Sequence, residues 1–314
     1  MTKEEMASRL LQFGDFNCKN DVFFQKEEAI SLFERNRKEQ ISMDDHVRNA
    51  KVTDHVKRNQ TDKLSGFFKS YATDIIIEKN TVLIDSIANR KVAIDCGCGK
   101  GEYLRVLSHK FDLVIAIDLS LEAITYSKNA HKDLENIIYV NGSMLDFYKV
   151  FTRPIADFCL SAEVIEHVPC PKFYLKSINN LLKNDGNLLI STPCQNLYFY
   201  PFQFLRTSLM KPRTLMKLLN PLENWEFALD WHPALSKKDL VKILNEHGFK
   251  ESYYQSFRPY YEDTFPLMFY LAKVLPKDFG LKFYKKYLSA YNRFVEKVGL
   301  GIRQHALCSK QDEF

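Results

Sequence analysis

A glycine-rich turn flanked by two carboxylates is the group of residues best placed to do chemistry. It follows a short apolar run, residues 92–94, which is typical of a strand buried on both faces, and it precedes a helix expected over residues 102–109. Alternate glycines let the backbone turn sharply and let a ligand lie against bare main chain. The three glycines are Gly97, Gly99 and Gly101. Strand, turn and helix N-terminus together predict a nucleotide-binding loop.

The spacing and charge of this loop indicate which nucleotide it binds. A dinucleotide-binding loop has glycines at its first, third and sixth positions, but Glu102 occupies the sixth position here. A diphosphate favours the positive end of a helix without carboxylates beside it, whereas Asp95 and Glu102 flank this loop. That charge suits a ligand carrying an amine and a sulfonium, so we infer S-adenosylmethionine. The alternative is a tight turn that binds no ligand.

A further carboxylate ends the next apolar run, residues 111–117. Asp118 lies about 20 residues beyond the glycines, where an acid can accept both ribose hydroxyls of an adenosine. Asp118 or Ser120 would also serve as the N-cap of the helix expected over residues 121–130. The two roles are compatible, and Asp118 is the better ribose ligand.

Strands and helices alternate along the remaining chain. Further strands are expected over residues 137–140, 156–161, 186–192, 250–257 and 303–310, and helices over 173–182 and 236–247. This alternation predicts an α/β fold with a doubly wound, mainly parallel, seven-stranded sheet of the Rossmann-like type. Ligands of such sheets bind at the carboxyl ends of the strands. Four of the singled-out residues fall there, namely Gly97, Asp118, Ser143 and Glu163.

The chain divides into an N-terminal extension and one larger domain. Residues 1–88 are charged and almost free of glycine, and we expect them to form a helical cap over the nucleotide site, including a helix over residues 64–87. The larger domain is expected over residues 89–310. It carries helical insertions at residues 194–230 and 262–300.

Composition sets outer bounds on function. The net charge of +5 is mild and does not demand nucleic acid. The seven cysteines include no pair with the spacing of a zinc or redox motif, which favours reduced thiols in a cytoplasmic compartment. The longest apolar stretch, residues 265–275, contains Lys273 and is too short to span a bilayer. We therefore expect a cytoplasmic protein, or one that rests peripherally on a membrane surface.

Together these motifs resemble the class I S-adenosylmethionine-dependent methyltransferases over residues 85–310. Residues 95–101 resemble their first motif, Asp118 resembles the ribose-binding acid, and residues 141–144 resemble the adenine-binding turn. That family usually has aspartate where Ser143 stands, and a serine there can still offer a hydrogen bond. The resemblance implies cofactor contacts from Asp95, Gly97, Cys98, Gly99, Gly101, Asp118, Leu119, Ser143, Met144 and Ala162.

Residues 162–169, 189–193 and 231–236 narrow the resemblance to the branch that contains the ubiquinone-biosynthesis O-methyltransferases. In that family a Glu-x-x-Glu-His motif can hold a divalent metal beside the substrate. The resemblance therefore implies magnesium, manganese or zinc as a second cofactor. Its ligands would be Glu163, Glu166 and His167.

The same motif has two metal-free interpretations. It shapes the turn after the fourth strand, or His167 acts as a general base for a hydroxyl acceptor. Small-RNA 2′-O-methyltransferases resemble the same pattern and add a later histidine, for which His232 is the nearest match. His232 is therefore a second candidate base.

Two insertions bear on the acceptor. Residues 194–222 combine aromatic and basic side chains without an acid, and an apolar helical stripe over residues 281–298 has lysine and arginine beside it. The stripe consists of Leu281, Tyr284, Leu288, Tyr291, Val295 and Val298. Such segments suit an anionic membrane surface and a lipid-like acceptor. They would also suit RNA phosphates, or a lid packed on the body.

The sequence thus predicts an S-adenosylmethionine-dependent methyltransferase acting on an oxygen of a small or lipid-like acceptor, such as a quinol or phenol. An RNA 2′-O-methyltransferase is one alternative, but the modest net charge and the lack of a recognisable RNA-binding module argue against it. A non-catalytic scaffold with the same fold is the other alternative.

Overall fold

The computed structural model describes residues 2–12, 14–26, 63–168, 170–194, 235–257, 277–298, 301 and 303–311. Within these residues the strands form one nine-stranded sheet. They are β1 (Phe16–Lys19), β2 (Val22–Gln25), β3 (Val92–Cys96), β4 (Leu113–Asp118), β5 (Ile137–Asn141), β6 (Ala156–Ala162), β7 (Leu182–Pro193), β8 (Phe249–Phe257) and β9 (Arg303–Lys310). Their order across the sheet is β1-β2-β5-β4-β3-β6-β7-β9-β8.

Seven of these strands, β3 to β9, form the predicted doubly wound sheet. Neighbours from β5 through β7 are parallel, and β9 runs antiparallel to both β7 and β8. Every residue of β3 and β5 is buried, as expected for parallel strands covered by helices on both faces. The α/β, mainly parallel Rossmann-like prediction is confirmed.

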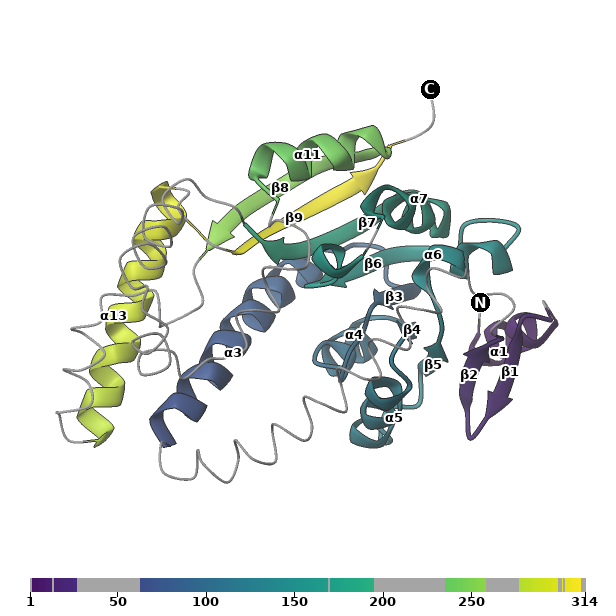
Figure 1. The fold of residues 1–314 in the computed structure, drawn as a ribbon, viewed down its shortest axis with the longest axis horizontal. Coiled ribbons are helices and arrows are strands. Elements are labelled where there is room, and N and C mark those ends of the chain that lie inside the picture. Colours follow the sequence, from purple (N-terminus) through teal and green to yellow (C-terminus); the bar gives the residue numbers. More distant parts are fainter. Residues whose placement is uncertain are drawn as a thin grey trace, which may run out of the picture.

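Helices cover both faces of the sheet (Figure 1). They are α1 (Lys3–Gln12), α3 (Lys63–Asp85), α4 (Leu104–Lys110), α5 (Leu121–Ala130), α6 (Met144–Phe147), α7 (Pro171–Leu181), α11 (Lys237–Glu246) and α13 (Lys277–Val298), with 3₁₀ turns at Tyr148–Val150 and Ile165–His167. Helices α1, α6, α7 and α11 pack into the core of one face, and α3, α4 and α5 into that of the other. No described helix is both long and apolar enough to cross a bilayer.

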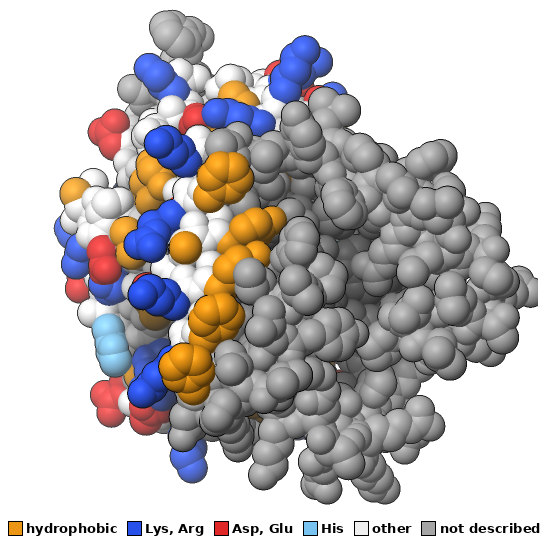
Figure 2. Space-filling view, turned by 90° about the vertical axis from the view of Figure 1, so that its left-hand side faces the viewer, with side chains coloured by type: hydrophobic (Ala, Val, Ile, Leu, Met, Phe, Trp, Pro, Cys, Tyr) orange, Lys and Arg blue, Asp and Glu red, His pale blue; other side chains and the backbone are white. Residues whose placement is uncertain are grey.

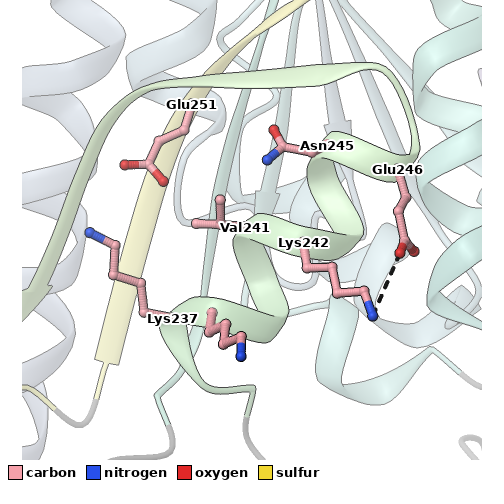
Figure 3. A pocket seen from close by; sticks show the side chains of 7 residues that line it. Lys237, Val241, Lys242, Asn245, Glu246 and Glu251 are labelled. Atoms are coloured by element: carbon pink, nitrogen blue, oxygen red, sulfur yellow. Dashed lines mark ion pairs between the residues drawn. The ribbon is translucent and has the colours of Figure 1, made fainter.

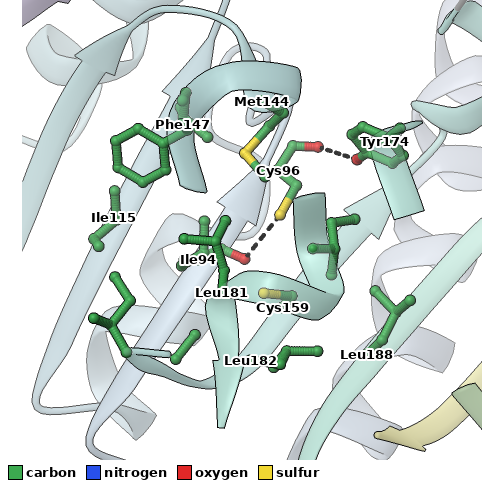
Figure 4. Packing of buried hydrophobic residues seen from close by; sticks show 14 of the residues in the cluster. Ile94, Cys96, Ile115, Met144, Phe147, Cys159, Tyr174, Leu181, Leu182 and Leu188 are labelled. Carbon is green, nitrogen blue, oxygen red and sulfur yellow. Dashed lines mark hydrogen bonds between the residues drawn. The ribbon is translucent and has the colours of Figure 1, made fainter. Parts of the chain in front are cut away.

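Alternate residues of β3 feed the two cores. Ile94 and Cys96 face the α7 side, and Ala93 faces the α4 side, which is the two-residue period of a strand. Figure 4 shows the α7 side, where Tyr174 reaches from the helix to the end of β3. Its hydroxyl donates to Cys96 O at 3.1 Å and also bonds Ser161 Oγ at 2.9 Å. This buried tyrosine ties together the carboxyl ends of β3 and β6, where the loops of the site begin.

The N-terminal extension departs from the expected helical cap. Helices α1 and α3 form, but β1 and β2 make a hairpin that joins the sheet, with β2 parallel to β5. Asn20 and Asp21 both have positive φ, 51° and 53°, the backbone that a two-residue hairpin turn needs. Four-residue strands beside charged residues gave little sequence signal. Residues 27–62, also expected to be helical, lie outside the described residues.

The sequence predicts a glycine stop after two helices, Gly186 after α7 and Gly248 after α11. The first prediction was wrong and the second was confirmed. Residues 183–186 were expected to close α7 with a glycine stop, but the chain passes through the extended Leu182 directly into β7. Ser236 caps α11 as predicted, accepting a hydrogen bond from Asp239 N at 3.2 Å. Gly248 then follows that helix with φ of 76°.

Candidate active site

The glycine loop is folded back against the end of β4. Gly97 N and Cys98 N donate to the Ile117 carbonyl at 2.8 and 3.0 Å. Gly97, Gly99 and Gly101 have φ of 90°, 53° and 86°, in the region where only glycine is free of strain. The alternate glycines predicted to bend this backbone therefore do so.

Asp118 anchors this loop. Its Oδ2 accepts a hydrogen bond from Gly99 N at 2.9 Å, and its Oδ1 accepts one from Ser120 N at 2.8 Å. Gly99 and Asp118 are thus adjacent, as a shared nucleotide site requires. The helix cap is Ser120, whose hydroxyl accepts from Ala123 N at 3.1 Å. A carboxylate oxygen can accept more than one hydrogen bond, so a carboxylate at this position is of the type that binds ribose hydroxyls.

One side of the loop is open and the other is closely packed. Among the described residues, a Cβ added at Gly99 would meet only Glu102 Oε2, at 3.7 Å, whereas one at Gly97 would lie 2.8 Å from Val164 Cγ2. Val164 belongs to the turn after β6. The open side can accept a ligand against bare main chain, and the closed side sets the loop against the neighbouring turn.

Asp95 is a buried carboxyl group whose position favours a positively charged ligand. Its side chain is 2% exposed, and among the described residues Oδ2 has no hydrogen-bond partner. Burial, followed by repulsion from Glu102 and Asp118, raises the pKa of Asp95 well above its ordinary value. A cationic ligand group would supply the missing partner and favour the carboxylate. These residues therefore fit an ammonium-bearing adenosyl ligand.

The turn after β5 is held by the N-terminal hairpin. Gln25 of β2 accepts a hydrogen bond from Ser143 N at 2.8 Å. Ser143 Oγ accepts one from Leu145 N at 3.1 Å and so caps α6. Asn141 Nδ2 donates to the carbonyls of Asp118 and Leu119 at 3.1 and 2.9 Å. The turn is therefore fixed beside Asp118, although the expected adenine contact of Ser143 stays a prediction.

Two other expected cofactor contacts lie at strand ends. Met144 follows this turn and is largely buried in the core on the α7 side. Ala162 is the last residue of β6, half-buried and packed against the opposite core. Gln25 was missed because nothing in residues 1–26 marks a polar side chain that will reach a turn more than a hundred residues away.

Glu163 and Glu166 follow β6, at the edge where the carboxyl ends of β6 and β7 meet the start of β9. We call this edge the acceptor side, because the expected acceptor would bind there. Glu163 has φ of 57°, and its carboxylate pairs with Arg303 at the start of β9. Glu166 Oε2 accepts from the Thr192 hydroxyl of β7 at 2.9 Å. Their spacing in the sequence predicts that both acids lie on the same face of one helical turn. That prediction was wrong, because the 3₁₀ turn begins only at Ile165 and leaves Glu163 outside it.

The predicted metal ligands do not form a metal site in the described part of the chain. No group of three His, Cys, Asp or Glu there is placed to hold an ion. The Arg303 guanidinium already pairs with Glu163, and Glu166 is turned toward Thr192. His167 is exposed at the end of its turn. The metal prediction thus finds no support, since a cation would compete with Arg303.

Burial raises the pKa values of both acids, Glu163 and Glu166. It raises the pKa of Glu166 to about 8, and the charge of Glu163 adds to the effect. Burial also raises the pKa of Glu163, against the opposing effect of Arg303. A carboxylate that titrates near neutral pH is suited to accept a proton. Of the two predicted histidine bases, His167 lies beside Glu166, and His232 lies outside the described residues.

A buried hydrogen-bond network joins α3 to Tyr103 and to β9, beside the acceptor side. Asn80 of α3 donates to the Tyr103 hydroxyl at 2.8 Å and is 3.0 Å from His305 Nδ1 through its carbonyl oxygen. Burial, followed by the charge of Lys79, lowers the pKa of His305 to about 4. Sequence reasoning missed this network. The available signal was Asn80 itself, a polar residue within an apolar helical stretch.

Two surface hollows lie elsewhere. One follows α11 and β8, lined by Lys237, Lys238, Val241, Lys242, Asn245, Glu246 and Glu251 (Figure 3). The second is lined by α1 and by Val92, at the amino end of β3. Neither is lined by residues of the glycine loop or of the turn after β6. The chemistry described above therefore lies outside both hollows.

Comparison with known proteins identifies the family. Residues 68–251, more than half of the chain, match the family model described as a methyltransferase domain. The chain belongs to this family, and the predicted class I S-adenosylmethionine-dependent methyltransferase family is confirmed. A chain in the solved complex of the Haloferax volcanii Trm112 methyltransferase activator has a TM-score of 0.50 at 14% identity, covering 76% of this chain and 90% of that one. It shares the fold.

Curated relatives cover smaller parts of the chain. A ubiquinone biosynthesis O-methyltransferase of Glaesserella parasuis serovar 5 is 34% identical over 106 residues, 32% of this chain and 45% of that protein. The protein of that description from Nitrosomonas europaea is 27% identical over 171 residues, 52% of this chain and 66% of that protein. The chain thus spans about half the length of the curated relatives that it matches.

Proposed function

We propose that this protein transfers a methyl group from S-adenosylmethionine to a hydroxyl oxygen of a small or lipid-like acceptor, such as a quinol or phenol. The observation that carries the proposal is the junction of the glycine loop with β4. Gly99 N lies 2.9 Å from Asp118 Oδ2, and Asp95 presents a buried oxygen that has no partner among the described residues. Family membership and the O-methyltransferase relatives support it.

The cofactor would be held by backbone and carboxylates. Gly97, Gly99 and Gly101 offer bare main chain, Asp118 would accept the ribose hydroxyls, and Asp95 would pair with the amino group. When bound, S-adenosylmethionine supplies an electrophilic methyl group on a sulfonium. The chain has to align the acceptor with that methyl group and exclude water, which is how most of the rate enhancement would arise.

A hydroxyl acceptor also has to lose its proton. Glu166 is our first candidate base, because the pKa of its carboxyl is raised to about 8. Its carboxylate would take the proton from the acceptor oxygen as that oxygen bonds to the methyl carbon. The bond from that carbon to sulfur would break, and S-adenosylhomocysteine would leave as the neutral thioether. His167 and His232 are the alternative bases. Arg303, paired with Glu163, fixes the turn that carries Glu166.

The test has two stages. Isothermal titration with S-adenosylhomocysteine should show one binding site, and the absence of binding would end the proposal. Transfer of a labelled methyl group is then measured on catechols, quinols, other phenols and an RNA. Product spectra should show a methyl ether. Methylation confined to carbon, nitrogen or RNA would overturn the assignment of the acceptor while leaving the cofactor site intact.

A further inference from the structure

Helix α13 carries three large aromatic side chains in solvent. Phe279, Phe283 and Phe294 are 61%, 37% and 60% exposed. Successive residues of a helix are about 100° apart around its axis, so these three rings lie within about 60° of one another. Along the axis they spread over about 22 Å. Exposed apolar groups gathered on one helix indicate a contact surface rather than scattered surface residues.

Four basic residues form a second strip along the same helix. Lys282, Lys286, Arg293 and Lys297 are all exposed. They also lie within about 60° of one another, directly beside the aromatic strip. Figure 2 shows the two kinds of side chain as neighbouring columns running down this side of the molecule. We call this pair of strips the α13 face.

The α13 face points away from the body of the protein. Glu296, the acid among the described side chains of this helix, pairs with Lys79 of α3 at 2.6 Å and accepts from Gln255 of β8 at 3.2 Å. It lies at least about 100° around the helix from the three phenylalanines. The acid therefore fastens the helix to the body, and the basic and aromatic strips remain outward.

We propose that the α13 face binds the surface of an anionic lipid membrane. A helix lying in the interface buries its apolar strip below the headgroups and places basic residues at the lipid phosphates. Each lysine or arginine near such a surface strengthens binding. A membrane surface presents both layers that the two strips require, an apolar one and a phosphate one. The net charge of the chain is only +5, which favours a membrane over RNA, and RNA binding is the alternative outcome of the test below. The inference goes beyond the proposed function and does not depend on it.

The predicted apolar stripe and this face are different sets of residues. The side chains of Leu281, Tyr284, Leu288, Val295 and Val298 lie outside the described residues. Tyr291 is half-buried and stacks on Tyr287 with ring centroids 6.0 Å apart. The proposal therefore uses none of the stripe.

Co-sedimentation of the full chain with vesicles tests the proposal. We expect binding to phosphatidylcholine vesicles that contain phosphatidylglycerol, little binding to phosphatidylcholine alone, and release at high salt. Replacing the four basic residues by glutamine should weaken binding about 1,000-fold. The matched control removes four exposed lysines elsewhere and should keep wild-type binding. Those lysines are Lys172, Lys176, Lys238 and Lys250.

A second variant tests the apolar half. Replacing Phe279, Phe283 and Phe294 by serine should also abolish sedimentation with anionic vesicles, because the apolar strip would be gone. Phe173→Ser, at a residue 65% exposed on α7, is its control. Equal loss in the controls, equal binding to neutral vesicles, or RNA binding that depends on the same residues would overturn the proposal. Unchanged circular dichroism and thermal unfolding confirm that each variant is folded, whether or not S-adenosylhomocysteine binds. Titration with S-adenosylhomocysteine is measured separately and tests only the cofactor site.

Discussion

The cofactor side and the acceptor side of the sheet are built on different principles. At the ends of β3, β4 and β5, backbone groups make most of the contacts, as in the bonds from Gly97 N and Cys98 N to Ile117 O. At the carboxyl ends of β6 and β7 and the start of β9, side chains from distant parts of the chain meet. Arg303 and Glu163 are 140 residues apart in sequence, and His305 and Asn80 are 225 apart.

This difference predicts which side of the site can accept substitutions. A backbone cradle tolerates few substitutions, because its geometry depends on glycine conformations. A surface of paired side chains can be altered residue by residue while the sheet beneath stays the same. The cofactor side should therefore respond to mutation through binding of the cofactor, and the acceptor side through turnover and stability.

The largest effect should follow from Asp118→Ala. This change removes the acceptor of the Gly99 N and Ser120 N bonds together with the proposed ribose ligand. Hydrogen bonds to charged groups contribute about 1.5–3 kcal/mol each, so the Kd for S-adenosylhomocysteine should rise at least about 100-fold by calorimetry. Asp112→Ala, at an exposed residue before β4, is the control. A change smaller than about 3-fold would contradict the site.

Glu166→Gln should separate the two sides, because it should lower turnover without weakening binding of the cofactor. We expect kcat to fall about 100-fold with little change in the Kd of the cofactor. The active form of the base is the carboxylate, so the wild-type rate should rise with pH and level off above the pKa of about 8. The variant should lose that rise.

The control for this prediction is Glu246→Gln on α11, which should keep the wild-type pH profile. If the rise persists in Glu166→Gln but disappears in His167→Gln, then His167 is the base. That result would place the proton transfer one residue further along the same turn.

Arg303→Gln should lower stability more than cofactor affinity. The Arg303 and Glu163 side chains are only 17% and 28% exposed, and removing one partner leaves a partly buried charge, costing about 2 kcal/mol in urea unfolding. The pKa of Glu163 should rise further, so the loss should grow with pH. Arg105→Gln breaks an exposed pair with Asp133 and should cost less than about 0.5 kcal/mol. Equal losses would refute the distinction.

The smallest effect should come from Gln25→Ala, which tests whether the N-terminal hairpin supports the cofactor side. Loss of its bond to Ser143 N should weaken S-adenosylhomocysteine binding about 5-fold, equivalent to about 1 kcal/mol. Asn17→Ala, at an exposed position of the same hairpin, should change nothing. An effect of equal size in both variants would mean that the hairpin matters only for folding.

The sequence predicted the cofactor side well because its requirements are local. Gly97, Gly99 and Gly101 had to adopt positive φ whatever the rest of the chain did, and Asp118 ended a strand recognisable from its own residues. The carboxyl ends of parallel strands then had to meet at one edge.

The acceptor side could not be predicted in this way. That Arg303 meets Glu163 depends on β9 inserting antiparallel between β7 and β8, which no local pattern specifies. The metal prediction found no support for the same reason: the spacing of Glu163, Glu166 and His167 is compatible with ligation, but Arg303 arrives from elsewhere. Gln25 was missed likewise, since β2 joins β5 only in the folded sheet.

The contact between Gly97 and Val164 joins the two sides. The turn after β6 fills the space that a side chain at Gly97 would need. The glycine loop and this turn are therefore in direct contact. A molecule that shifts Val164 must alter the shape offered to the nucleoside, and the converse holds to the same degree. Methyl donor and methyl acceptor should therefore bind with mutual dependence, each changing the affinity for the other.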